Sequence, residues 1–171
     1  MQPPSVTTTV DLYLANSCLR AELPSRGFGR LSDVLNNLPS AFINGTLLHV
    51  SEPTEAGEPT VERQARNLVV RLQDVLFVRP LDETSEAPTA ATAERRDRLQ
   101  QRMVVQLDDW RIIGNLHLVD QVRWLEFVTA ANSRFVPMTQ VAVLPPGHGE
   151  SIECPFVLVN GARLSAIYEA V

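Results

Sequence analysis

The amino-acid sequence predicts a mainly β protein of the α+β class, with two short helices and two tandem copies of one β-β-α-β-β module. Two observations predict this architecture. Apolar residues alternate with polar residues in several short segments, and a shift of 93 residues brings the first half of the chain onto the second. A change from alternation to a spacing of three and four residues marks one helix in each copy.

The repeat is the basis of the predicted domain organisation. Residues 10–50 match 103–143 without a gap, and after a loop of unequal length 68–70 match 156–158 and Val78 matches Ile167. Chance resemblance between two β-rich stretches is the alternative. The persistence of the register through two strands, a helix and a third strand argues against it. The identical pairs are Leu14/Leu107, Leu23/Leu116, Arg30/Arg123, Ser40/Ser133, Phe42/Phe135, Thr46/Thr139 and Val50/Val143.

A hairpin is expected to open each copy. In the first copy apolar residues occupy positions 10, 12 and 14, the polar pair Asn16-Ser17 follows, and alternation resumes at positions 19, 21 and 23. In the second copy the corresponding strands are 103–107 and 112–116, on either side of Asp108-Asp109. Asparagine, aspartate and serine favour turns because their short side chains bond the local backbone.

A short helix and a third strand come next in each copy. Apolar residues at positions 31, 34, 35 and 38 form a stripe along one helix face, and positions 124, 127, 128 and 131 repeat it. The third strands are expected at 42–50 and 135–144. A second hairpin is expected to end each copy, with strands at 68–72 and 75–79 in the first and at 156–159 and 164–168 in the second. Asn160-Gly161, between the last two, is a strong signal for a tight hairpin turn.

These elements divide the chain into a disordered N-terminus (1–9), a first module (10–81), a polar linker (82–102) and a second module (103–171). The linker is rich in small and polar residues and shows no periodicity. A module of this size has a marginal core by itself. The second helix carries more apolar surface than one thin sheet needs. We therefore expect the modules to pack as a dimer with approximate twofold symmetry.

The segments VDLYLANSCLRAEL, VVQLDDWRIIGNL and FVLVNGARLSAI resemble the strand pairs of Sm-like, SH3-type small β-barrels. The chain is also similar to uncharacterised bacterial proteins with a duplicated domain of this kind, through Arg30-Leu31-Ser32-Asp33, 134–139 and 155–160. The resemblance implies that each module is a small antiparallel barrel and assigns no activity. Sm-like proteins bind RNA, but their Arg-Gly pair is missing from both final turns, where Gln73-Asp74 and Asn160-Gly161 stand instead.

No residue pattern in the sequence indicates an active site, and the protein is not expected to be an enzyme. His49, His117 and His148 lack the close pairing of zinc ligands, and no metal or cofactor site is predicted. Asp108-Asp109 is interpreted as a solvated turn. Cys18 and Cys154 fall at non-equivalent places in the repeat, which favours two reduced thiols.

The expected function is a non-enzymatic binding or assembly module, because exposed strand edges can be paired by another chain. A protein partner or self-association fits this description. The alternatives are Sm-like RNA binding and a small-ligand sensor domain. The net charge of −5 makes nucleic acid an unfavoured partner, although Arg95, Arg96, Arg98 and Arg102 form one basic cluster. No signal peptide or membrane span is indicated, so a cytoplasmic location is expected.

Overall fold

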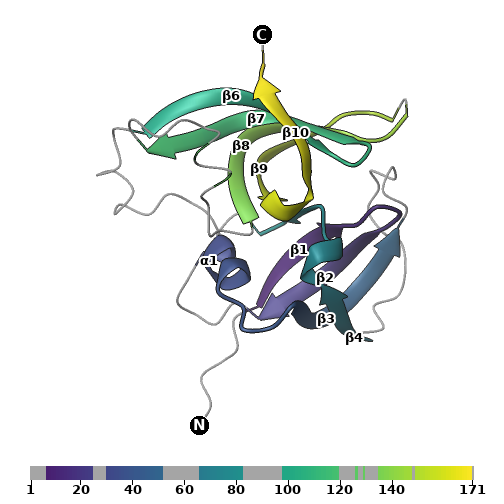
Figure 1. Cartoon of the computed structure of the whole chain (residues 1–171). Helices are drawn as coiled ribbons and strands as arrows, with labels where there is room; N and C mark the ends of the chain where they lie inside the picture. The colour runs from purple at the N-terminus through teal and green to yellow at the C-terminus, as the bar shows by residue number, and fades with distance from the viewer. Residues whose placement is uncertain are drawn as a thin grey trace.

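A computed structural model describes residues 7–24, 30–51, 66–82, 98–119, 135–147 and 149–170, together with Glu126 and Thr129. Most of these residues belong to antiparallel strands (Figure 1). The first half of the chain contains β1 (Thr7–Tyr13), β2 (Cys18–Pro24), the helix α1 (Leu31–Asn36), β3 (Phe42–Ser51), β4 (Arg66–Arg71), the 3-10 turn η1 (Leu72–Asp74) and β5 (Phe77–Pro80). The second half contains β6 (Arg98–Leu107), β7 (Trp110–Val119), β8 (Phe135–Leu144), β9 (Ile152–Asn160), the 3-10 turn η4 (Gly161–Arg163) and β10 (Leu164–Glu169).

Within the described residues, ten strands form one sheet in the order β10-β6-β7-β8-β9-β5-β1-β2-β3-β4. The prediction of an α+β fold, with two Sm/SH3-like barrels packed as a pseudo-twofold dimer, is therefore wrong. The finding that overturns it is the pairing of β5 with β9, which makes the two halves parts of a single open sheet. A twofold interface would pair equivalent strands with each other. Here the last strand of the first half pairs with the fourth strand of the second.

The two halves nevertheless arrange their five strands in the same order and register. Val10 lies opposite Ala21 in the first half, and Met103 lies opposite Gly114, each 93 residues later, in the second. The pairing of β2 with β3 is irregular between Arg20 and Ala21, and the pairing of β7 with β8 is irregular at the matching place. Beyond the loops of unequal length the offset is 89, since Val70 opposite Ile43 corresponds to Val159 opposite Val136. Residues 68–70 therefore correspond to 157–159, and the predicted match to 156–158 is wrong by one residue.

The hairpins predicted at the end of each copy are wrong, because β5 pairs with β1 and β9 rather than with β4, and β10 pairs with β6 rather than with β9. A 3-10 turn, η1 or η4, redirects the chain onto the first strand of its own half. At Asn160-Gly161 the expected tight turn does not form. The side chain of Asn160 is instead buried and bonded to η1 in the other half.

Several predicted boundaries can be compared with the structure. The third strands lie at Phe42–Ser51 and Phe135–Leu144, close to the predicted ranges. β1 begins at Thr7, inside the segment assigned to the N-terminus, and β6 begins at Arg98, inside the segment assigned to the linker. The helix expected around 124–131 falls mostly outside the described residues. Only Glu126 and Thr129 of it are described, and both have helical backbone.

Two buried apolar clusters fill the curved sheet, one in each half, and each cluster includes residues of the other half. The second-half cluster includes Tyr13, Cys18, Leu76 and Phe77 from the first half. The first-half cluster includes Phe135 and Leu158 from the second half. The four consecutive residues Val75–Val78 are completely buried, so both faces of the chain at β5 are covered. This burial is the physical reason that the halves share a sheet, because β5 supplies side chains to both clusters.

Candidate functional site

The junction between β5 and β9 is the contact that joins the two halves. Phe77 lies opposite Val159, and Val78 lies opposite Leu158. All four side chains are buried. A strand edge that is paired and covered on both faces is closed to other chains. Among the described strands, β4 and β10 are then the outer strands of the sheet.

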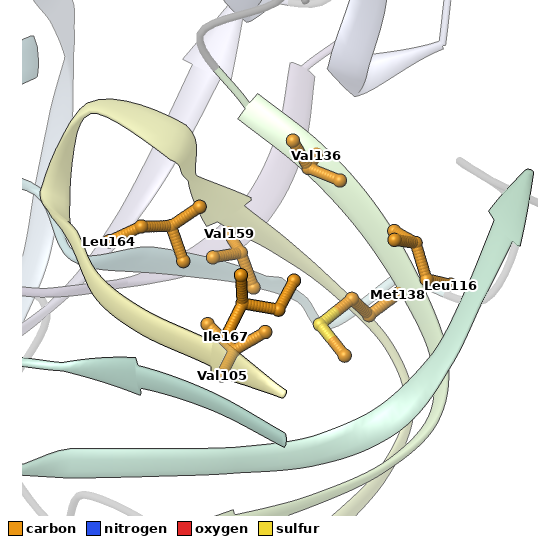
Figure 2. A pocket seen from close by; sticks show the side chains of 7 residues that line it. All are labelled: Val105, Leu116, Val136, Met138, Val159, Leu164 and Ile167. Atoms are coloured by element: carbon orange, nitrogen blue, oxygen red, sulfur yellow. The ribbon is translucent and has the colours of Figure 1, made fainter. Parts of the chain in front are cut away.

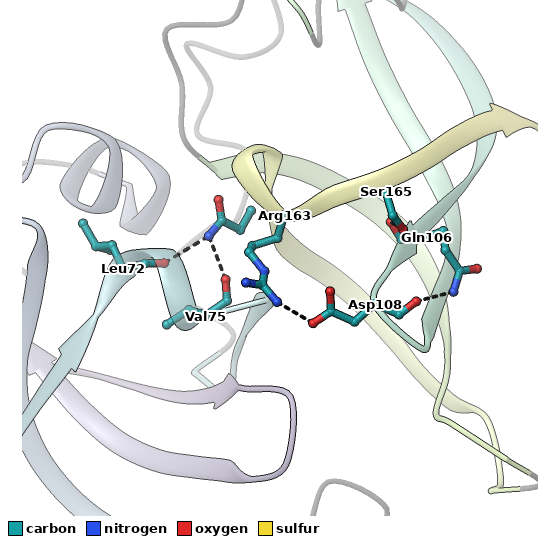
Figure 3. A network of polar contacts seen from close by, with 7 residues as sticks. Leu72, Val75, Gln106, Asp108, Arg163 and Ser165 are labelled. Atoms are coloured by element: carbon teal, nitrogen blue, oxygen red, sulfur yellow. Dashed lines mark hydrogen bonds and ion pairs between the residues drawn. The ribbon is translucent and has the colours of Figure 1, made fainter.

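Asn160 makes four hydrogen bonds, three of which fasten the end of β9 to the first half. Its backbone N–H donates to the carbonyl oxygen of Leu76 at 2.9 Å. Its side-chain amide donates to the carbonyl oxygens of Leu72 at 3.0 Å and Val75 at 2.7 Å (Figure 3). Its side-chain oxygen accepts from the N–H of Ala162 at 3.1 Å. One buried amide thus ends β9, shapes η4 and binds η1 of the other half.

A second asparagine makes the matching contact from α1. The side-chain amide of Asn36 donates to the carbonyl oxygen of Phe135 at 3.0 Å, and its side-chain oxygen accepts from the Phe135 N–H at 2.7 Å. Both backbone groups at the start of β8 are satisfied in this way. The contact orients the buried ring of Phe135, which belongs to the first-half cluster.

Three aromatic rings cover the other face of the junction. The ring of Phe77 stacks on Tyr13 with centroids 4.2 Å apart and meets the edge of Trp110 at 5.3 Å. Tyr13 and Trp110 also meet edge to face, at 5.5 Å. Such pairs add to the stabilisation given by apolar burial alone. The cluster is structural, because its rings are buried and pack on one another.

A row of charges crosses β5, β1 and β2. Asp11 lies directly opposite Arg20 on one side and Arg79 on the other, with ion-pair distances of 2.8 Å and 3.2 Å. Asp11 is buried, so its charge requires these partners. In the second half the same register positions hold Val104, Ile113 and Tyr168, an apolar row. No local sequence pattern marks this row.

The histidines and acids singled out in the sequence are not brought together. His49 lies on β3, His117 bonds the Thr139 hydroxyl at 2.7 Å on β7, and His148 is outside the described residues. Asp108 and Asp109 form the exposed turn between β6 and β7, where Asp108 pairs with Arg163 (Figure 3). Among the described residues, no group of three or more His, Cys, Asp or Glu side chains could hold a metal ion.

The two cysteines are free thiols, and their surroundings oppose the reactive form. Burial raises the pKa of Cys18 to about 12 and the pKa of Cys154 to about 11. The thiolate is the nucleophile, and a nucleophilic cysteine needs a lowered pKa. Neither thiol therefore has the electrostatic surroundings of a catalytic cysteine.

We expect both thiols to react with Ellman's reagent at least about a hundredfold more slowly in the folded protein than in the urea-unfolded chain at mildly alkaline pH, with Cys18 the slower of the two. The rate in the folded protein should rise as the pH approaches 11, where Cys154 titrates. The raised pKa values stabilise the folded protein below about pH 9, and this contribution is lost as the pH rises toward 11 and 12. Equal rates in folded and unfolded protein would show that the thiols are not protected.

The open edges of the sheet are the candidate functional site. We define the β4 edge as Arg66–Arg71 and the β10 edge as Leu164–Glu169, the two strands at the ends of the strand order. Val69 on the β4 edge is 65% exposed, Tyr168 on the β10 edge is 47% exposed, and Phe42 on β3, opposite Arg71, is 41% exposed. Three of the four large exposed hydrophobic residues in the described chain therefore lie on or beside an open edge.

A cavity lies beside the β10 edge. It contains about 260 Å³ of space not filled by atoms, part of it open to solvent. Figure 2 shows seven apolar side chains around it, contributed by β6, β7, β8, β9 and β10. They are Val105, Leu116, Val136, Met138, Val159, Leu164 and Ile167. The lining is entirely apolar and offers no polar group to orient a reacting molecule.

The basic cluster predicted in the linker is described only in part. Arg95 and Arg96 lie outside the described residues, and Arg102 is exposed on β6. The junction, the charged row and the pairing of Asn160 were missed because each depends on contacts between distant segments. Two signals could have indicated the junction, namely the unbroken apolar runs 75–78 and 156–159, which are typical of strands buried on both faces.

No known family model, no curated protein and no solved structure matches this chain. Among the helices of the described residues, none is both long and apolar enough to cross a membrane.

Proposed function

We propose that this protein is a non-enzymatic binding or assembly module that recognises a protein partner by adding a strand to the open edges of its sheet. The observation that carries the proposal is the exposure of apolar side chains on and beside both edges, above all Val69 and Tyr168. In strand addition the backbone of the edge supplies hydrogen bonds, and alternate side chains supply contacts with the partner. The proposal places the protein in the cytoplasm, where Cys18 and Cys154 would remain reduced.

Both edges have backbone groups available for such pairing. The N–H of Leu72 donates inward to Ala41, so by strand alternation the N–H groups of Val69 and Arg71 face away from β3. The N–H of Ala170 donates inward to Arg102, so the N–H groups of Ile167 and Glu169 face away from β6. An added strand would form its backbone hydrogen bonds with these outward-facing groups.

Devices that block edge pairing are sparse on these strands. Natural sheets protect their edges with lysine, proline, bulges or covering segments. The whole sequence contains no lysine, and neither edge strand contains proline. The pairing of β10 with β6 is irregular between Leu164 and Ala166, at the start of the strand. The charged residues of the edges are at or near their ends, as Arg66, Arg71 and Glu169. The middle of each edge is therefore suited to pairing.

Site-specific photo-crosslinking tests the proposal on the full chain. The photoreactive residue p-benzoylphenylalanine would replace Val69 or Tyr168, and the control would carry it at Arg111. Arg111 is exposed but lies on β7, where it is paired with Gln106 of β6 on one side and with Leu144 of β8 on the other. In an extract of the producing cells, we expect the edge positions to form about tenfold more protein adducts than the control position. Equal labelling from all three positions, or no adduct from either edge, would refute the proposed function.

A further inference from the structure

We propose that the partner of the β10 edge is the β4 edge of a second copy of this chain, so that molecules join head to tail into one longer sheet. The inference rests on the proposed function and names the partner for it. The junction inside the molecule supports it, because β5 and β9, which pair there, are the repeat counterparts of β10 and β4.

The strands that meet at the junction have their counterparts at the two open edges. β5 is the last strand of the first half and pairs with its first strand, as β10 does in the second half. β9 is the fourth strand of the second half and pairs with its third strand, as β4 does in the first half. A contact of β10 with β4 of a second copy therefore repeats the contact of β5 with β9. Such a contact joins two different surfaces, so it propagates along a row of molecules.

The side chains that β8 and β9 bury at the junction also have exposed counterparts. Phe135 and Leu158 are both 0% exposed and complete the first-half cluster. Their counterparts in the repeat are Phe42 and Val69, which are 41% and 65% exposed. Burying two such side chains on association would remove apolar surface from water. Their exposure is explained if they complete the corresponding cluster of a second molecule.

The cavity beside the β10 edge is the place where the second-half cluster lacks residues equivalent to Phe135 and Leu158. Six of its seven lining residues correspond to members of the first-half cluster. The pairs are Val105 with Leu12, Leu116 with Leu23, Val136 with Ile43, Val159 with Val70, Leu164 with Val75 and Ile167 with Val78. In the first half, Phe135 and Leu158 belong to the cluster that these counterparts form. In the second half, a small apolar hollow that is partly open to solvent remains at this place (Figure 2). Phe42 and Val69 of a second copy have the apolar character to pack over it.

The backbone pattern sets the register of the proposed contact. At the junction Val78 lies opposite Leu158, and their counterparts are Ile167 and Val69. The N–H groups of Ile167 and Val69 face outward from their edges, because the N–H groups of Ala170 and Leu72 donate inward and alternate residues face opposite sides. Residues directly opposite each other in this way exchange two hydrogen bonds. We therefore place Ile167 of one molecule opposite Val69 of the next.

The other face of the junction is not repeated at the open edges. Phe77 corresponds to Ala166, Tyr13 to Gln106 and Asn160 to Arg71, so the aromatic stack and the buried amide have no counterpart. The contact between molecules is consequently weaker than the junction, and the assembly should dissociate on dilution. Arg66 and Arg71 on one edge and Glu169 on the other give the two edges opposite charge.

Sedimentation velocity of the purified full chain, from low micromolar to near millimolar concentration, tests the inference. We expect species larger than the 19.0 kDa monomer that grow with concentration. Val69→Lys should block the β4 edge and weaken assembly by about tenfold or more. Glu169→Pro should block the β10 edge, because it removes an outward N–H and leaves the bonds to β6 in place. Val50→Lys is the control with a similarly exposed valine, and thermal unfolding checks that each variant folds.

Mixing the two blocked variants tests the head-to-tail arrangement. Each variant alone should be monomeric, whereas the mixture should form a dimer of one molecule of each and nothing larger. Photo-crosslinking from position 69 in the purified protein should label the segment Leu164–Glu169 of a second copy. Dimers of a single blocked variant, or adducts elsewhere, would refute the arrangement. If the purified wild type is monomeric while edge crosslinks to other proteins persist in extracts, the inference fails and the proposed function stands. If neither is seen, both fail.

Discussion

Replacing Phe77 by alanine is expected to lower the free energy of unfolding by about 3–5 kcal/mol, the range for a large aromatic residue removed from a core. The ring is completely buried, stacks on Tyr13 at 4.2 Å and meets the edge of Trp110 at 5.3 Å. Phe77 belongs to the first half of the chain but packs in the second-half cluster. Its loss should therefore weaken the contact between the halves as well as the core.

Urea unfolding monitored by tryptophan fluorescence and far-UV circular dichroism measures this loss. Phe42→Ala is the matched control, since Phe42 is the counterpart of a junction residue but is 41% exposed. The control should lose about 1 kcal/mol or less when measured at low protein concentration. Equal losses for the two variants would show that Phe77 does not hold the buried position described here.

Replacing Asn160 by alanine is expected to cost about 3 kcal/mol of stability. The side-chain amide donates to two carbonyl oxygens of the first half, and its oxygen accepts from Ala162. Each buried polar group left without a partner costs about 1–3 kcal/mol. Asn160→Asp should be at least as destabilising, because a carboxylate cannot donate to the carbonyl oxygens of Leu72 and Val75.

Chemical denaturation of the two Asn160 variants is compared with that of Asn37→Ala. Asn37 is exposed and donates one hydrogen bond to the carbonyl oxygen of Asp33 at the end of α1. Its removal should cost a few tenths of a kcal/mol to about 1 kcal/mol, because water can replace an exposed partner. A loss at Asn160 as small as that at Asn37 would mean that the amide does not bridge the two halves.

The sequence predicts most strands well because their signals are local. Alternation at positions 10, 12 and 14 and at 19, 21 and 23 marks the face that packs on the first-half cluster, and β1 and β2 contain most of these positions. In β1 the opposite face is buried as well, at Asp11 and Tyr13. The stripe beginning at Leu31 predicts α1, of which Leu31 and Leu35 are buried. The third strands are also predicted closely. In each case the residues that determine the element are neighbours in the chain.

The pairing partners of β5 and β9 could not be predicted in this way. The run 75–78 shows that a strand is buried on both faces, but not which strands cover its edges. At Asn160-Gly161 the local signal for a hairpin was misleading, since the asparagine side chain is engaged by Leu72 and Val75 of the other half. A long-range contact thus prevails over the local turn preference.

For the candidate site, the sequence predicts only that exposed strand edges exist. Exposed strand edges were expected from the abundance of strands, but the sequence does not show that β4 and β10 are the open ones. Asp11 lies between the apolar residues Val10 and Leu12 in the chain, and across the hairpin it lies opposite Arg20. The third member of the row, Arg79, is brought by β5 across a longer stretch of chain, which explains why the row was missed.

The central claim is that β5 and β9 make the two halves one sheet, and nuclear Overhauser effects between backbone protons test it most directly. Phe77 and Val159 lie opposite each other, and the hydrogen bond from the neighbouring Asn160 N–H to the Leu76 carbonyl oxygen makes them a non-hydrogen-bonded pair, in which the α-carbons approach to about 4.5 Å. We predict a strong cross-peak between the α-protons of Phe77 and Val159. Complete sets of cross-strand peaks within each half, with this peak absent, would contradict the single sheet.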